Sequence, residues 1–406
     1  MSSLRTLITD RRFAAYFLAR SGAELAFGIE SVAIAWQIFL LRHQVLDLGL
    51  IGLMLFIPQL VLAIPAGVLA DRFERRTVCV VFACVEMLCE FLFVALVVLH
   101  VTSLPVYFSA VLLIGTAHAL GTPAERALLA GIVRSEHYVR AQAFSATAMQ
   151  LITVAGPAIG GFLLAISIPT AFIVAAICYG IAAVGFSLIS VEGNPEREEI
   201  PLREAVNGIR FIFAHKVILG AISLDLFAVL FGGATALLPY FASDVFHIGP
   251  SGLGILRSAP GLGAAVVAAI IVRWPIQRHA GVLMCWCVAG FGVATIVFGV
   301  SKNLWLSVIS LFATGAFDMV SVVVRNALVM LQTPDEMRGR VGAVENIFIG
   351  ASNQLGAFES GGIAALIGAV PAVALGGVAT IVIIAIWTRL FPPLITLDRF
   401  DTSSAS

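Results

Sequence analysis

Apolar residues are gathered into twelve blocks, each long enough to cross a lipid bilayer as a helix. A bilayer core about 30 Å thick needs roughly 20 apolar residues per helix. Because lipid offers backbone groups no hydrogen-bond partner, such blocks must form helices that satisfy their own backbone. The predicted helices begin near residues 14, 48, 78, 104, 140, 168, 217, 252, 281, 304, 341 and 370. The pattern therefore predicts an all-α membrane protein with twelve transmembrane helices.

The second half of the chain repeats features of the first half at a constant interval. The paired positions are Ala127 and Ala327, Leu128 and Leu328, Glu136 and Glu336, Arg140 and Arg340, and Gly156 and Gly356. Two similar halves are typical of secondary transporters, whose substrate site lies at the interface of the repeats. We therefore predict two pseudo-symmetric six-helix bundles, at 1–191 and 217–406, the second ending in a short cytoplasmic tail.

A cytoplasmic linker at 192–216 is the one long polar interruption, and it falls at the expected midpoint. In its second part, apolar residues recur at helical spacing with charged residues between them: Leu202, Val206, Ile209 and Phe213. This spacing predicts a short amphipathic helix that lies on the inner membrane surface.

Composition and charge support a membrane location. Hydrophobic residues make up 60% of the chain and charged residues only 12%, where soluble proteins carry about 25%. Lys and Arg gather in alternate loops, and only Arg42 and Lys302 fall in the loops between them. The excess of positive charge on the cytoplasmic side of membrane proteins then places both termini in the cytoplasm. A net charge of zero and the lack of a basic face argue against nucleic-acid binding.

Enzyme chemistry has no support in the sequence. We find no phosphate-binding loop, nucleophile elbow or metal-ligand spacing, and the six cysteines all lie inside apolar blocks. We therefore expect neither catalytic residues nor a metal or cofactor.

The loop after the second predicted helix places an acid among arginines. Asp71 lies where that helix meets the inner membrane interface, and Arg72, Arg75 and Arg76 follow it. Gly67, one turn earlier, would let a neighbouring helix approach closely. An acid here can cap a neighbouring helix and pair with an Arg, which forms a latch that opens when the halves move. The alternative is a solvated turn whose arginines only set the topology.

The fifth predicted helix contains a run of small residues around a proline. Gly156 and Gly160 are four residues apart, so they share one helix face and permit close packing there. Pro157 removes a backbone donor and bends the helix. Gly161 extends the same small surface.

These two segments resemble the major facilitator superfamily. The loop matches the family pattern Gly-x-Leu-Ala-Asp-Arg-x-Gly-Arg-Lys except that Glu74 replaces the later Gly, which puts the tight turn in doubt. The small-residue run resembles the antiporter motif of the superfamily's exporters. The segment 332–341 is similar to a hallmark of the branch of enterobactin and macrolide exporters.

The resemblance implies a monomeric inner-membrane exporter of small organic molecules, driven by the proton gradient through alternating access. Its partners would be a siderophore- or drug-like solute and the lipid bilayer. A lysophospholipid flippase, a solute importer of the same fold and a sensor that binds without transport remain alternatives.

Charged residues inside the membrane are costly, so each is expected to be functional or paired. Arg20 and Glu24 are four residues apart and are expected to form an ion pair, and they are also candidates for proton coupling or substrate binding. Glu86 and Glu90 also share a helix face, and His118 titrates in the physiological range. Two roles remain open for these three, a proton-carrying one and a purely structural one.

The remaining intramembrane charges are our candidates for coupling and substrate binding. We predict that Glu30 or Asp225, with Asp318 next, exchanges protons with the two sides of the membrane. Arg257 and Arg325 could hold an anionic group of the substrate, although Arg325 could instead extend its side chain to the inner surface.

Overall fold

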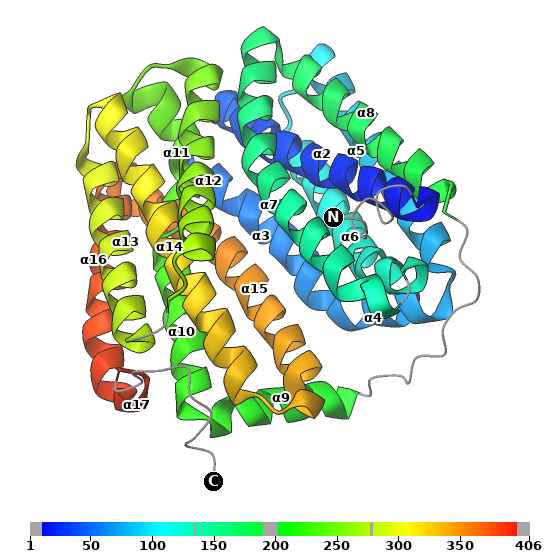
Figure 1. The fold of residues 1–406 in the computed structure, drawn as a ribbon. Helices are drawn as coiled ribbons and strands as arrows, with labels where there is room; N and C mark the ends of the chain where they lie inside the picture. The colour runs from blue at the N-terminus through cyan, green and yellow to red at the C-terminus, as the bar shows by residue number, and fades with distance from the viewer. Residues whose placement is uncertain (1–9, 134, 190–201, 277–278, 396–406) are drawn as a thin grey trace. The chain divides into compact units, whose positions relative to one another are not determined.

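A computed structural model describes residues 10–395 except 134, 190–201, 277 and 278. Within these residues the chain is helical and contains no strand (Figure 1). The long helices are α2 (Arg11–Arg42), α3 (Val45–Val61), α5 (Arg75–Val98), α6 (Leu104–Ile132), α7 (Ser135–Ile166), α8 (Ile168–Ser187), α10 (Lys216–Phe231), α12 (Gly249–Arg273), α13 (Ala280–Val300), α14 (Leu304–Gln332), α15 (Asp335–Ile367) and α16 (Ala369–Leu390). Shorter helices are α4 (Ala63–Arg72), α9 (Leu202–Ala214) and α17 (Pro392–Ile395).

The membrane-spanning helices follow the predicted blocks. In the described part of the chain, 10 helices are long and apolar enough to cross a membrane, and α3 with α4, bent by 58°, makes 11. The 33-residue α15 brings the number of long helices into line with the predicted twelve. Predicted starts at 104, 168 and 304 coincide with observed ones, and the start at 341 comes late because α15 begins at Asp335. The predicted fold class is confirmed.

Two compact units make up the molecule. The first contains Met1–His43, Met54–Glu199 and Ile248–Ser258, and the second contains Gln44–Leu53, Ile200–His247 and Ala259–Ser406. Of the predicted linker, 192–201 lies outside the described residues, and the division of the chain into bundles at 1–191 and 217–406 stays a prediction.

Helix packing repeats from one unit to the other. In the first unit, α2 packs against α7 and α8, and α5 packs against α6 and α8. In the second unit, α10 packs against α15 and α16, and α13 packs against α14 and α16. The paired helices occupy equivalent positions along the two halves of the chain. The sequence repeat therefore corresponds to a repeated structure.

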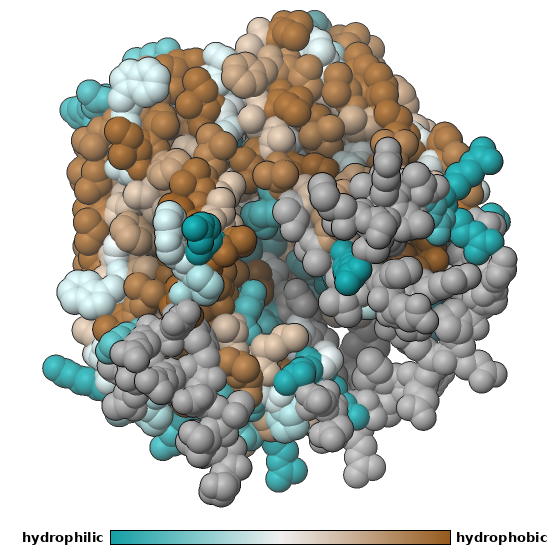
Figure 2. All heavy atoms as spheres, viewed as in Figure 1, coloured by the Kyte–Doolittle hydropathy of each residue, from teal (hydrophilic) through white to brown (hydrophobic). Residues whose placement is uncertain are grey.

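Apolar side chains cover the outer surfaces of the helices, as lipid contact requires. On α13, Trp286, Val293 and Val300 recur every two turns and are 72%, 52% and 58% exposed. Figure 2 shows hydrophobic residues over much of the described surface in view, including the region where α13 and α14 lie. Water would not tolerate so many exposed large apolar residues on one face, whereas a bilayer would.

The predicted linker helix is present as α9 and packs against α15. Ile212 is buried between Ile218 and Val341, while Ile209 and Phe213 are exposed. One face of α9 therefore packs against the bundle, and apolar side chains on another part of the helix stay exposed. The side chains of Leu202 and Val206 lie outside the described residues, and contact with the membrane surface stays a prediction.

Candidate functional site

One face of α14 is polar along three turns. Thr314, Asp318, Ser321 and Arg325 are spaced by four, three and four residues, so they point to the same side of the helix. Asn303 begins the helix by accepting hydrogen bonds from the backbone amides of the first turn at 2.9 and 3.2 Å. Helices α10, α13 and α15 of the second unit surround this face.

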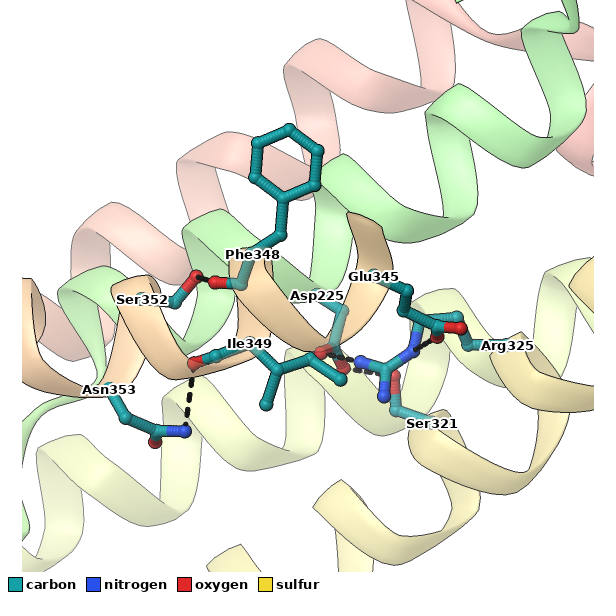
Figure 3. Close-up of polar contacts among 8 residues, drawn as sticks. All are labelled: Asp225, Ser321, Arg325, Glu345, Phe348, Ile349, Ser352 and Asn353. Carbon is teal, nitrogen blue, oxygen red and sulfur yellow. Dashed lines mark hydrogen bonds and ion pairs between the residues drawn. The ribbon is translucent and has the colours of Figure 1, made fainter. Parts of the chain in front are cut away.

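A buried ionic network lies at the Arg325 end of this face (Figure 3). The Nη1 of Arg325 pairs with Oδ2 of Asp225 on α10, and its Nε donates to Oε1 of Glu345 on α15 at 2.9 Å. Ser321 donates to Oδ1 of Asp225 at 3.4 Å. Arg325 is 3% exposed and Asp225 5%. One guanidinium therefore holds three helices together, and the side chain does not extend to the surface.

A pocket with a cavity volume of about 170 Å³ opens at the other end of the polar face. Its polar lining comes from Thr235, Thr295, Thr314, Asp318 and Asn353, and the ring of Phe291 forms part of its apolar wall. This volume is smaller than that of whole small-molecule pockets, about 300–1,000 Å³, and fits part of an organic solute. An apolar pocket with a few polar groups is the usual form of a site for an organic solute.

Asp318 connects the pocket to the ionic network. A smaller cavity of about 10 Å³ is lined by Asp225, Ser321 and Asp318 together. Among the described residues, the Asp318 carboxylate has no hydrogen-bond or ion-pair partner. It is therefore available either to a ligand group or to a proton.

The seventh span is broken beside the pocket, and we did not predict this from the sequence. Helix α10 ends at Phe231, and the chain continues as a 3₁₀ turn (Ala234–Leu237) and a π turn (Phe241–Val245). Gly232 and Gly233 line the pocket at the break. Interrupted helices of this kind are typical of transporter binding sites. The signal that we overlooked is the Gly232–Gly233 pair within an apolar block.

The other predicted arginine of the second half, Arg257, lies in α12. Its Nε is buried and has no hydrogen-bond partner among the described residues. The predicted role of Arg257 in binding an anionic group stays a prediction.

The predicted ion pair between Arg20 and Glu24 is wrong. Arg20 donates to the hydroxyl of Tyr16 at 2.7 Å, and Glu24 accepts from Thr153 of α7 at 2.8 Å. Arg20 bonds to a tyrosine of its own helix α2, Glu24 bonds to a residue of α7, and no ion pair joins the two in the described structure. Helical spacing brings side chains within reach, but it does not decide which of the available contacts form.

Glu30 is buried in α2 at 1% exposure, and its Oε2 accepts a hydrogen bond of 3.1 Å from Tyr179 of α8. His118, considered alone in the sequence, has its Nδ1 3.5 Å from Oε1 of Glu86. Sequence distance hides both contacts, because the partners are 149 and 32 residues apart.

The arginine-rich loop is tied to neighbouring helices. Arg75 is buried and donates to the carbonyl of Ala127 on α6, and its Nη2 lies 4.0 Å from Oδ1 of Asp71. Arg76 donates to the carbonyl of Ile189. Arg72 remains exposed. These bonds fix the loop within the first unit.

Two details of this loop differ from what the family pattern suggests. Glu74 has φ −58° and ψ 114°, which any residue adopts, and it bonds to Arg76 and Thr77. The turn therefore does not need a glycine there. At Gly67, an added Cβ would meet no described atom within 4 Å, so the close helix contact predicted there is not found.

The small-residue run of α7 does make the predicted close contacts. A Cβ on Gly156 would lie 2.9 Å from the Cα of Gly28 on α2, and one on Gly160 would lie 3.0 Å from the backbone of Ile29. Gly161 is similarly close to Gly254. Pro157 is inside α7, which continues through it.

Comparison with known proteins agrees with this architecture. A model of the family described as "transmembrane secretion effector", of the major facilitator superfamily, matches residues 2–405. Enterobactin exporters are similar over almost the whole chain. That of Escherichia coli O81 is 28% identical over 98% of this chain and 95% of its own length, and that of Citrobacter koseri 28% over 94% and 92%.

Solved transporter structures share the fold. The nucleoside transporter NupG covers 94% of this chain and 99% of its own, with a TM-score of 0.66 and 14% identity. A bacterial homologue of the human lysosomal transporter Spinster covers 95% and 97%, with a TM-score of 0.69 and 15% identity. The long apolar helices, their repeated packing and these matches together show that the chain belongs to the transmembrane secretion effector family of major facilitator transporters.

Proposed function

We propose that this transporter exports small organic molecules from the cytoplasm in exchange for protons, by alternating access. Enterobactin-like siderophores are the first substrate class to test, because relatives named as enterobactin exporters are similar along nearly the whole chain. The protein would act as a monomer in the inner membrane with both termini in the cytoplasm, and the bundles at 1–191 and 217–406 would rock against each other.

The observation that carries this proposal is the pocket beside Asp318. The pocket is large enough for part of an organic solute, and the Asp318 carboxylate that lines it has no partner among the described residues. A solute beside Asp318 would lie close to the Arg325 network, because Asp318 and Asp225 line one cavity. Binding of a solute or a proton at Asp318 would therefore change the electrostatic potential at the Arg325 network, which holds α10, α14 and α15 together.

Proteoliposomes with a pH-sensitive dye inside test the proposal directly. We expect protons to cross the membrane when a catecholate siderophore, a macrolide or a cationic dye is added on the side that carries the cytoplasmic face of the protein. An imposed proton gradient should also drive the same solute uphill. Asp318→Asn keeps the side-chain volume but removes the charge, and it should abolish uphill transport.

Asp244→Asn is the matched control, because Asp244 is an exposed carboxylate of the same unit. It should transport like the unmodified protein. Solute flux that ignores the proton gradient would refute proton coupling, and flux only in the inward direction would indicate an importer. If no solute moves but lysophospholipid crosses the bilayer, the protein is a flippase.

A further inference from the structure

Three buried carboxyl groups of the first unit lie close to one another and to a histidine. Glu30 of α2, Glu86 and Glu90 of α5 and His118 of α6 form this group, which we call the acid cluster. Glu30, Glu86 and Glu90 are 1%, 5% and 0% exposed, whereas the side chain of His118 is 45% exposed. Glu30 interacts electrostatically with Glu90, Glu86 and His118, and Glu90 interacts with Glu30 and Glu86.

Hydrogen bonds account for only part of the cluster. Tyr179 donates to Glu30 at 3.1 Å, and His118 lies 3.5 Å from Glu86. Both oxygens of Glu90 are buried without a hydrogen-bond partner among the described residues. A carboxylate can only accept hydrogen bonds, so two facing carboxylates cannot bond to each other. If one of them is protonated, its O–H group supplies the missing donor.

Electrostatics leads to the same result. An unpaired buried carboxylate is far too costly, and such a group takes up a proton instead. The charged groups around Glu30 and Glu90 are Glu86 and His118, with no Lys or Arg among them in the described part of the chain. Their other titratable neighbours are the thiol of Cys89 and the hydroxyl of Tyr179, which are neutral at physiological pH.

In the second unit, buried carboxylates are compensated in a different way. There, Asp225 and Glu345 are compensated by Arg325, whose charge is permanent. In the part of the chain that the structure describes, the acid cluster has no permanent cation, so its negative charge is reduced by bound protons.

We propose that Glu30 and Glu90 share one exchangeable proton, and that His118 and Glu86 pass protons to and from this pair. The proposal rests on the proposed proton coupling and adds a second proton site, in the first half of the chain, to the one proposed at Asp318 in the second half. The side chain of His118 is 45% exposed while that of Glu86 is 6% exposed, so the imidazole is the member that reaches out of the buried cluster.

The transfer balances without any other reactant. His118 takes up a proton on Nε2 and gives one from Nδ1 to a Glu86 oxygen, which restores the neutral imidazole. Glu86 passes the proton to Glu90, one helical turn away, which becomes the acid that donates to Glu30. Beyond His118, the next charged neighbours are Glu125 of the same helix and Arg20 of α2, and Arg20 is held by Tyr16.

Infrared spectroscopy of the full chain in lipid nanodiscs tests the proton directly. At neutral pH we expect the carbonyl stretch of a protonated carboxylic acid, shifted on transfer to D₂O. The band should be lost in Glu90→Gln and in Glu30→Gln, which remove one member of the pair but keep its volume. Asp244→Asn, at an exposed carboxylate, should leave the band unchanged.

Transport measurements distinguish this proposal from the proposed proton-coupled export. Glu90→Gln should keep downhill solute flux but lose proton-driven accumulation, and Glu90→Asp should restore part of it. A missing band in the unmodified protein, or a band unchanged in both Gln variants, overturns the shared proton even if proton exchange with solute is observed. A band that behaves as expected, together with transport that ignores protons, leaves the site in place and refutes its role in coupling. Should Glu90→Gln not fold, Glu30→Gln decides the same question.

Discussion

At the scale of single residues, Arg325 has the most demanding position in the second unit. It is 3% exposed and its guanidinium is shared between Asp225 and Glu345, which come from two other helices. A buried ion pair adds little to stability when it is complete, because desolvation offsets the attraction. Breaking it by removing one partner is costly, because a charge then remains buried alone.

We therefore predict that Arg325→Met lowers the free energy of unfolding by about 3–5 kcal/mol, since two buried carboxylates lose their cation. Thermal unfolding in detergent micelles measures the change. Arg389→Met removes an exposed arginine of α16 and should have almost no effect. Adding Asp225→Asn to Arg325→Met should recover part of the lost stability. Equal melting temperatures of Arg325→Met and Arg389→Met would contradict the network.

At the scale of helices, glycines decide how closely α2 and α7 approach. Gly28 and Gly156 face each other so closely that a Cβ on either would lie within 2.9 Å of the other's backbone. Backbone atoms cannot move aside as a side chain can. The contact is therefore specific to glycine on both helices.

The same substitution at two glycines should have opposite effects. Gly156→Ala must force α2 and α7 apart, and we expect it to destabilise the protein by about 1–3 kcal/mol. Gly362→Ala lies in α15 where a Cβ would meet no described atom within 4 Å. There the gain in helix propensity, about 0.5–1 kcal/mol, should dominate. Melting temperatures that change in the same direction would show that the contact does not limit packing.

At the scale of the whole molecule, the two units share their helix pairing but differ in how they compensate buried acids. In the second unit an arginine compensates Asp225 and Glu345, whereas among the described residues the acid cluster of the first unit has a histidine and no arginine or lysine. The charge of an arginine does not change with pH, but the charge of the acid cluster does. This difference is why we place a second exchangeable proton, besides the one proposed at Asp318, in the first half.

The orientation in the membrane gives a prediction for the whole chain. A cysteine introduced as Lys302→Cys, between α13 and α14, should react with a membrane-impermeant maleimide added to intact cells. Arg389→Cys should react only after the cells are opened. The six native cysteines lie within α5, α8 and α13 and serve as an unlabelled background. The reverse labelling pattern would invert the predicted topology.

The sequence by itself determined the architecture. In lipid, backbone groups must bond within their own helix, so each long apolar block becomes a helix whatever its neighbours are. That local constraint explains why predicted helices at 104, 168 and 304 begin where the structure begins them. The small-residue contact at Gly156 was also predictable, because helical spacing alone places Gly160 on the same face.

Only the tertiary structure decided which charges meet. Arg20 and Glu24 have the right spacing to pair, yet each bonds to a different partner. Glu30 meets Tyr179, and Arg325 meets Asp225, across 149 and 100 residues of sequence. The partner of a buried charge is set by helix packing, and packing depends on the shapes of whole helices. A sequence shows that such charges need partners, but it does not show which partners they find.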